Sequence, residues 1–320
     1  MWIQGHRERL LLLTIALWSL VACAVPTTLK TAPRVASLTT DAVTPKAPRG
    51  SDKHKALIYV TDGCGGTCVL SYPDGKLVTT LNAGAYYNSG ACTDKNGDVF
   101  ISNYDSVLEY SHGGTTPIAK YELPGDQAKG CAVDQTTGTL AVVFVATYTD
   151  IAVFARGRGT PNLYASGLQS FSCAYDGSGN LFIGGYSGQQ TALAELPSGG
   201  TTFTTISIGN GSVPVPGQVQ WHGGYITFES IGRKQTIIYR LVISGSTATI
   251  IGKTRVIGPT RAYYSWIYGS RILIPYSTHG PDAQRLGVWQ YPQGGKALTN
   301  FEHFAGQSPR LQTATISTGT

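Results

Sequence analysis

Charged residues are scarce in this chain, and their scarcity limits what the protein can bind. Asp, Glu, Lys and Arg make up 13% of its 320 residues, and the formal net charge is +6. Most of that excess lies before residue 56, where eight Lys and Arg residues outnumber three Asp and Glu residues. From residue 56 onward the two signs nearly balance, at 16 against 15. A nearly neutral segment lacks the basic surface that nucleic acids require, so we predict no nucleic-acid partner.

The signatures of common enzymes are also absent. The sequence contains no G-x-S-x-G, H-E-x-x-H or phosphate-binding P-loop motif, and it has only six His residues. We therefore predict no catalytic residue, and the sequence favours a protein that is not an enzyme. Glycine, by contrast, is abundant at 40 residues. Because Gly supplies the positive φ angles of tight turns, this composition suits many short strands better than a helical bundle.

Only one long apolar run occurs, and it lies near the N-terminus. Residues 10–22 follow the basic residues Arg7 and Arg9, which is the pattern of an export signal. The run is too short to span a membrane comfortably, and no second run follows it, so we expect no membrane-spanning helix. Residues 1–22 are predicted to be a signal peptide.

The end of this run, Leu20-Val21-Ala22-Cys23, resembles the lipobox of bacterial lipoproteins. The resemblance implies a lipid anchor on Cys23, a membrane partner and a place in the bacterial cell envelope. Ala24 in the following position implies the outer membrane. Ordinary signal cleavage at Ala22-Cys23-Ala24 fits the same residues and stays open. Residues 23–55 hold few large apolar side chains, so they are predicted to be a disordered tether.

From residue 56 onward, short β-type runs alternate with turn clusters. One kind of run recurs with starts roughly 41 to 46 residues apart. The six copies are LIYVTD (57–62), DVFISNY (98–104), TLAVVFV (139–145), NLFIGGY (180–186), GYITFES (224–230) and SRILIPY (270–276). Two further apolar runs follow each copy, and a fourth run precedes all copies except the first. The pattern predicts repeated four-stranded units.

The strand that the first unit lacks is supplied by the other end of the chain. RLQTATI (310–316) has no unit of its own and can pair with residues 57–62. We therefore predict that residues 56–320 form an all-β, six-bladed β-propeller of four-stranded blades, closed by the C-terminal strand. A ring of seven blades is the alternative, but only six second strands can be counted.

The repeated pattern of G-x-A-x-D, a turn and then G-N-L-F-I-G-G-Y resembles the NHL and SMP-30-like propeller families. The resemblance covers residues 56–320 and implies the propeller architecture. It implies little about function, because propellers host unrelated functions.

One face of such a ring carries the longer loops, and we call it the upper face. It gathers the loops between the second and third strands of each blade and the loops that lead into each innermost strand. Tyrosines collect there, so we predict a surface that recognises a peptide, a glycan or a protein. The predicted binding residues are Tyr86, Tyr87, Tyr104, Tyr148, Tyr186, Glu229, Arg233, Tyr263 and Tyr264. Packing between neighbouring blades is the alternative role for each single tyrosine.

The cysteines of the exported part divide into two sets. Cys64 and Cys68 share one Gly-rich loop, and export implies an oxidising compartment, so we predict a local disulfide. A metal half-site is the alternative for this pair. Cys92, Cys131 and Cys173 lie in successive innermost strands, where we predict that they are buried packing residues.

A second function stays open beside the binding role. SMP-30-like lactonases hold a metal with a Glu, Asn-type residues and an Asp, and streptogramin lyases are also propellers. The nearest candidates here are Glu229, Asn103 and Asp62 at the upper ends of strands. This alternative implies a divalent cation at the channel mouth and a hydrolase or lyase activity. The binding role requires no cofactor.

Overall fold

The computed structural model describes residues 56–82, 89–146, 150–232, 235–259, 261–262, 264–277, 284–302, 304 and 311–319. The chain divides into two units, Met1–Pro45 and Lys46–Thr320, and every described residue belongs to the second. The predicted signal peptide, the tether and Cys23 lie outside the described residues, so these predictions stay untested. No helix that could cross a membrane occurs in the described part of the chain.

The described residues fold almost entirely into β-strands, with one short 3-10 turn, η1 (Ala155–Gly157). The first half of the unit forms three four-stranded sheets, one of which also includes the C-terminal strand. We call each set of antiparallel strands a group and name it by its first strand along the chain. The β1 group contains β1 (Leu57–Gly63), β2 (Gly66–Ser71), β3 (Leu77–Leu81) and the C-terminal β25 (Ala314–Ser317). The β4 group contains β4 (Gly90–Thr93), β5 (Val99–Ser102), β6 (Ser106–Tyr110) and β7 (Ala119–Glu122). The β8 group contains β8 (Cys131–Val133), β9 (Leu140–Val143), β10 (Ile151–Phe154) and β11 (Asn162–Tyr164).

The second half forms a sheet of thirteen strands that contains three antiparallel groups. The β12 group contains β12 (Gln169–Tyr175), β13 (Leu181–Ser187), β14 (Gln190–Leu196) and β15 (Thr204–Ile208). The β16 group contains β16 (Pro216–His222), β17 (Tyr225–Ser230), β18 (Gln235–Ser244) and β19 (Thr247–Ile257). The β20 group contains β20 (Arg261–Ala262), β21 (Trp266–Tyr268), β22 (Arg271–Ser277), β23 (Gln284–Gln290) and β24 (Gly294–Phe301). Strand β19 joins the three groups, because it pairs in parallel with β15 at one end and with β24 at the other.

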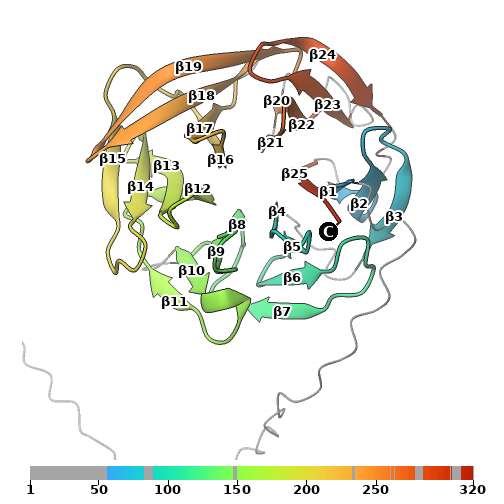
Figure 1. Ribbon diagram of the computed structural model, residues 1–320, viewed down its shortest axis with the longest axis horizontal. Helices are drawn as coiled ribbons and strands as arrows, with labels where there is room; N and C mark the ends of the chain where they lie inside the picture. Colours follow the sequence, from blue (N-terminus) through green and yellow to red (C-terminus); the bar gives the residue numbers. More distant parts are fainter. Residues whose placement is uncertain are drawn as a thin grey trace, which may run out of the picture. The chain divides into compact units, whose positions relative to one another are not determined.

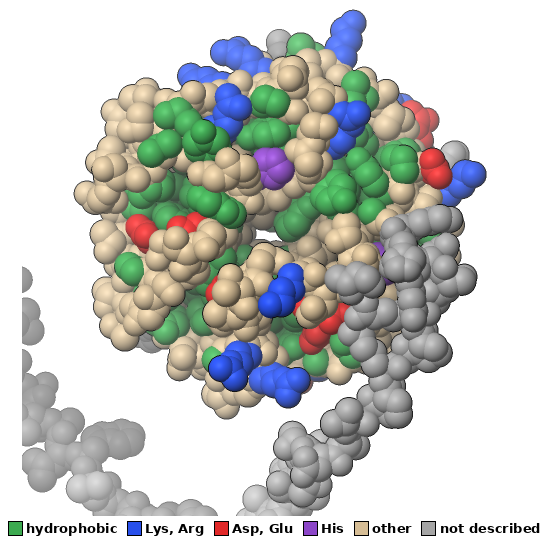
Figure 2. Space-filling view, in the orientation of Figure 1, with side chains coloured by type: hydrophobic (Ala, Val, Ile, Leu, Met, Phe, Trp, Pro, Cys, Tyr) green, Lys and Arg blue, Asp and Glu red, His purple; other side chains and the backbone are tan. Residues whose placement is uncertain are grey.

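The groups follow one another around a central axis (Figure 1). Strands β4, β8, β12, β16, β21 and β25 lie nearest the centre, while β3, β7, β11, β15, β19 and β24 form the rim. A space-filling view of one face shows an opening at the centre (Figure 2). Within each group the strands run antiparallel from the axis outward, as the repeated sequence pattern predicts.

The hydrophobic core lies between neighbouring groups rather than within them. One cluster packs Phe100 and Val107 of the β4 group against Leu140 and Phe154 of the β8 group. Another packs β1-group residues such as Tyr59 against Val99 and Tyr110 of the β4 group, and a third joins the β20 group to the β1 group. Burial of both sheet faces explains why the central strands are nearly continuous apolar runs. It also explains the glycines of NLFIGGY, since a Cβ on Gly184 would lie 2.5 Å from a methyl carbon of Val219.

The predicted strand positions are confirmed. Each of the six recurring runs contains a strand, namely β1, β5, β9, β13, β17 and β22. The C-terminal strand β25 pairs antiparallel with β1, Leu57 opposite Ser317 and Val60 opposite Ala314. The main difference from the prediction is the length of β18 and β19, at 10 and 11 residues. Many side chains of these two strands are exposed, because the hairpin extends beyond the core. There it reaches both neighbouring groups.

Candidate functional site

The upper face contains a cavity of about 830 Å³, which we call the upper cavity. The residues that line it come from loops that lead into innermost strands, from the innermost strand β12 and from the position two residues after β5. They are Ser89, Tyr104, Gln127, Lys129, Phe171, Tyr264 and Gln312. Two predicted binding residues, Tyr104 and Tyr264, are therefore brought to one cavity. Its volume lies within the range of roughly 300–1,000 Å³ that is typical of small-molecule sites.

The two tyrosines of the upper cavity differ in environment. Tyr104 is 39% exposed and can contact a ligand directly. Tyr264 is more enclosed: burial raises the pKa of its hydroxyl, and the nearby Glu229 carboxyl adds to that effect. The Tyr264 hydroxyl therefore stays protonated at physiological pH and can donate a hydrogen bond.

The upper cavity also contains a lysine that the sequence analysis did not select. The Lys129 ammonium lies 4.8 Å from the centre of the Phe171 ring and donates to the Ser170 carbonyl at 3.4 Å. Burial lowers the pKa of Lys129. The Phe171 ring in turn makes an edge contact with Tyr186, a predicted binding residue, with ring centres 5.8 Å apart. Tyr186 thus supports the wall of the cavity from behind.

Five predicted binding residues of the upper face lie outside the described residues. They are Tyr86, Tyr87, Tyr148, Arg233 and Tyr263. Their contribution to the cavity stays a prediction.

Glu229 lies beneath this face rather than on it. Its side chain is 1% exposed, and its Oε2 atom accepts hydrogen bonds from the backbone N–H groups of Ser265 at 2.9 Å and Gln218 at 3.2 Å. Burial raises the pKa of Glu229 to about 7, although both hydrogen bonds favour the charged form. No described residue hydrogen-bonds its Oε1 atom. The carboxyl group therefore ties β16 to the segment before β21 and keeps one oxygen available.

The two other metal candidates lie in different groups. Asn103 follows β5, is buried, and has an Oδ1 atom without a hydrogen-bond partner among the described residues. Asp62 lies in β1 with a left-handed backbone conformation at φ 59°. In the part of the chain that the structure describes, no three His, Cys, Asp or Glu side chains are grouped so that they could hold a metal ion.

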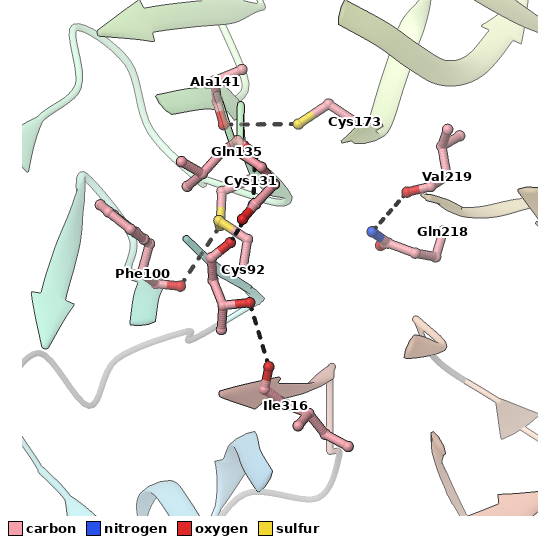
Figure 3. Close-up of a disulfide and its surroundings, with 11 residues drawn as sticks. Cys92, Phe100, Cys131, Gln135, Ala141, Cys173, Gln218, Val219 and Ile316 are labelled. Carbon is pink, nitrogen blue, oxygen red and sulfur yellow. Dashed lines mark hydrogen bonds between the residues drawn. A yellow bond between two sulfur atoms is a disulfide. The ribbon is translucent and has the colours of Figure 1, made fainter. Parts of the chain in front are cut away.

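The predicted disulfide between Cys64 and Cys68 is confirmed. The prediction for Cys92 and Cys131 was wrong: they form a second disulfide, which joins β4 to β8 (Figure 3). They were predicted to be buried packing residues, and their burial is confirmed. Innermost strands of neighbouring groups approach closely at the axis, however, with 5.7 Å between these two Cα atoms. Cys173 keeps a free thiol and is buried, as predicted.

A second cavity of about 350 Å³ follows the axis toward the opposite, lower face, and we call it the axial cavity. The second disulfide and Cys173 line its inner part. Nearer the lower face its walls include four large aromatic side chains, Tyr175, Trp221, Trp266 and Tyr268. All binding and metal candidates predicted from the sequence were assigned to the upper face. The signal in the sequence is that three successive innermost strands carry Tyr or Trp at their last or next-to-last position, namely Tyr175, Trp221 and Tyr268.

No protein-family model matches the chain, and no curated protein is significantly similar to it. Similar solved structures do exist. A chain in the crystal structure of a nidogen/laminin complex aligns with a TM-score of 0.63 and 14% identity, over 83% of this chain and 99% of that one.

Two further structures show the same likeness. A protein of unknown function from Bacteroides caccae aligns with a TM-score of 0.59 and 11% identity, over 82% of this chain and 99% of that one. Hydrazine synthase of Kuenenia stuttgartiensis aligns with a TM-score of 0.50 and 12% identity, over 69% and 68%. At these identities the likeness concerns the fold alone, and that fold is a β-propeller.

Proposed function

We propose that this protein is a lipid-anchored binding protein whose β-propeller recognises a peptide, a glycan or another protein through the upper cavity. One observation carries the proposal: residues from separate strand groups form a single cavity that includes Tyr104, Tyr264 and Phe171. Aromatic side chains provide large, rigid contact areas at a low cost in conformational entropy. Lys129 is the one charged residue among the described residues that line the cavity. The cavity therefore suits a ligand recognised mainly by shape, ring contacts and hydrogen bonds.

We also propose that the propeller has six blades and that β25 closes it. Two observations support this proposal. The strands form six successive groups, with β25 as the innermost strand of the first. The hydrophobic clusters also continue between the last group and the first, where Leu273 and Leu286 pack with Ile58 and Ile316. In a closed ring each group packs against two neighbours, and no sheet face is left open at a seam.

The anchor is proposed from the sequence alone. Leu20-Val21-Ala22-Cys23 follows an apolar run, and residues 23–55 provide a tether to the propeller. Stable attachment needs more than one acyl chain, which the bacterial lipoprotein modification provides. Cells grown with labelled fatty acid are expected to incorporate the label into the wild type but not into Cys23→Ala. An unlabelled but exported wild type would instead support ordinary cleavage.

The binding role can be tested in the intact chain by photocrosslinking. A photoreactive phenylalanine derivative at position 104 is expected to capture a partner in the cell envelope. The matched control places it at position 77, because Leu77 is 59% exposed on the rim strand β3. The Tyr264→Ala substitution is expected to abolish crosslinks from position 104. Crosslinks of equal yield from both positions, or none from position 104, would overturn the proposal.

A second candidate function, a metal-dependent hydrolase or lyase, is kept because of two buried oxygens. Glu229 Oε1 and Asn103 Oδ1 both lack a hydrogen-bond partner among the described residues, and both are oxygen ligands of the kind that hard divalent cations prefer. Two oxygen ligands are too few to hold such a cation by themselves, so they define no catalytic mechanism. Metal analysis of the purified full chain, compared with Glu229→Gln, tests this candidate. A stoichiometric metal lost in the variant would favour it.

A further inference from the structure

The aromatic side chains of the axial cavity are concentrated on one side of the channel. Tyr175 ends β12, Trp221 lies in β16, and Trp266 and Tyr268 lie in β21. These three strands are neighbours around the axis (Figure 1). The view in Figure 2 also shows hydrophobic side chains around the central opening.

Three of the four aromatic side chains are held in place by the core behind them. Trp266 and Tyr268 pack against the cluster between the β20 and β1 groups, and Tyr268 makes an edge contact with Tyr72 at 5.6 Å. Tyr175 packs against the cluster between the β8 and β12 groups. Trp221 extends toward the turn of the β12 group, near Gly177. It is 37% exposed, whereas tryptophans are highly buried on average. A fixed and partly exposed aromatic surface is organised for binding before a ligand arrives.

The opposite side of the cavity carries polar groups near the lower face. It is formed by the β4, β8 and β25 strands and their turns, which contribute Thr93, Lys95, Gln135 and Thr318. The Gln135 amide nitrogen donates to the carbonyls of Thr93 at 2.9 Å and Val133 at 3.0 Å. No described residue donates to the Gln135 amide oxygen, and Lys95 makes no ion pair within the described chain. A ligand can therefore find both an acceptor and a donor opposite the rings.

The charges of the cavity argue against a cationic ligand. Asp94 also lines it, but its own turn uses the carboxylate: Oδ1 accepts from the N–H groups of Asn96 at 2.9 Å and Asp98 at 2.8 Å. The Oδ2 atom accepts from the Asn96 amide at 2.8 Å. A quaternary ammonium ligand binds the faces of aromatic rings, and a positively charged side chain beside them would repel it. Lys95 is such a side chain in this cavity. A neutral ligand with both apolar and hydroxylated surfaces fits better.

We propose that the lower end of the axial cavity is a binding site for a neutral saccharide chain, with Trp221 and Trp266 as its stacking platform. The apolar C–H face of a sugar ring would lie against the aromatic side, and its hydroxyl groups would bond to Gln135 and Lys95 on the polar side. A volume of about 350 Å³ admits one or two sugar rings, so the site would hold the end of the chain. This site is separate from the upper cavity and does not depend on the function proposed for it.

Tryptophan fluorescence of the full mature chain tests this proposal. Of the five Trp residues, two precede residue 23, two line the axial cavity, and Trp289 is fully buried. We expect a saturable change in emission with at least one neutral probe among chitotetraose, cellotetraose and maltotetraose. Trigalacturonate and choline serve as anionic and cationic comparisons, and we expect neither to compete with the neutral probe.

Matched variants decide whether the site is the one proposed. Trp221→Ala is expected to weaken binding roughly tenfold, which corresponds to about 1.4 kcal/mol, while Trp221→Phe retains most of it. Because Trp221 is partly exposed, both variants should melt as the wild type does. Leu298→Ala, at an exposed position of the rim strand β24, should bind normally. The proposal is overturned if no neutral probe binds, if choline alone binds, or if Trp221→Ala binds as well as the wild type.

Discussion

The ionisation of Glu229 is coupled to folding between about pH 4.5 and pH 7. Its pKa is about 7 in the folded protein, against an ordinary value of 4.5, because it is buried. The folded state therefore holds the proton at a pH where the unfolded state has released it. Such a group costs no stability below about pH 4.5, and its cost grows as pH rises toward 7. Above that range the cost stays constant.

Glu229→Gln should remove this pH dependence. Gln keeps a carbonyl oxygen for the N–H groups of Gln218 and Ser265 but cannot ionise. The free energy of unfolding of the variant, relative to the wild type, should rise between pH 4.5 and 7 by up to about 3 kcal/mol. Urea unfolding at several pH values measures this difference. A difference that stays flat across the range would show that the carboxyl group is not shifted as described.

The cysteines lead to a second prediction, which concerns thiol number. The described chain contains two disulfides and the free Cys173, whose pKa is raised by burial. Alkylation of the exported protein should therefore modify no thiol when it is folded. It should modify Cys173 alone when the protein is unfolded without reductant, and five cysteines from position 64 onward after reduction. Mass spectrometry gives the count, and three modified thiols without reductant would contradict the Cys92–Cys131 bond.

The Cys92–Cys131 bond should also contribute more to stability than the Cys64–Cys68 bond. The two half-cystines are 39 residues apart in one pair and four in the other. On the loop-entropy model, the longer loop corresponds to about 4 kcal/mol and the short loop to less than roughly 3 kcal/mol. Thermal unfolding of Cys92→Ala/Cys131→Ala against Cys64→Ala/Cys68→Ala tests the order. A larger loss from the local pair would refute it.

At the level of the strands, close approach between groups decides which residues are tolerated. In β13, Gly184 faces Val219 and Phe228 of the neighbouring β16 group. An added Cβ at this position would lie 2.5 Å from Val219 Cγ2 and 3.0 Å from a ring carbon of Phe228. Both neighbours are fully buried, so neither can easily move aside.

Gly184→Ala should therefore lower the free energy of unfolding by roughly 1–3 kcal/mol through overpacking. Gly177→Ala is the matched control, because its added Cβ would meet Trp221 at an ordinary 3.5 Å. Denaturant unfolding of the two variants should separate them clearly. Equal stability of both variants would mean that the two groups pack less closely than the structure indicates.

The strands were predictable from the sequence because the same pattern recurs six times, so an ambiguous copy can be interpreted from the others. The six copies of one apolar run define the spacing of the units, and the turn residues between them show where the chain reverses direction. The second disulfide was not predictable, because Cys92 and Cys131 meet only when two innermost strands approach at the axis. The same holds for Lys129 and Phe171 in the upper cavity, which come from different strand groups. Contacts between groups depend on how neighbouring sheets pack against each other, which no single repeat encodes.

For the molecule as a whole, the seam between the chain ends is the critical connection. Strand β25 contacts more than its partner β1. The Ile316 carbonyl accepts a hydrogen bond from Thr93 at 3.4 Å, and the Ser317 hydroxyl donates to the Gly97 carbonyl at 2.5 Å. The same hydroxyl lies 2.6 Å from His112 Nδ1. The last strand of the chain therefore holds the first and second strand groups together.

Removal of residues 308–320 should abolish cooperative unfolding of the propeller. The truncation exposes the edge of β1, opens the cluster that Leu311, Ala314 and Ile316 share with the β20 group, and leaves the Gly97 carbonyl without its partner. Removal of residues 319–320 alone is the control, because it leaves β25 intact. Calorimetry should show one sharp transition for the control and a broad or absent transition for the truncated chain. A synthetic peptide of residues 308–320 should restore the sharp transition when added to the truncated chain. A truncated chain that melts as the control does would show that the ring does not depend on its last strand.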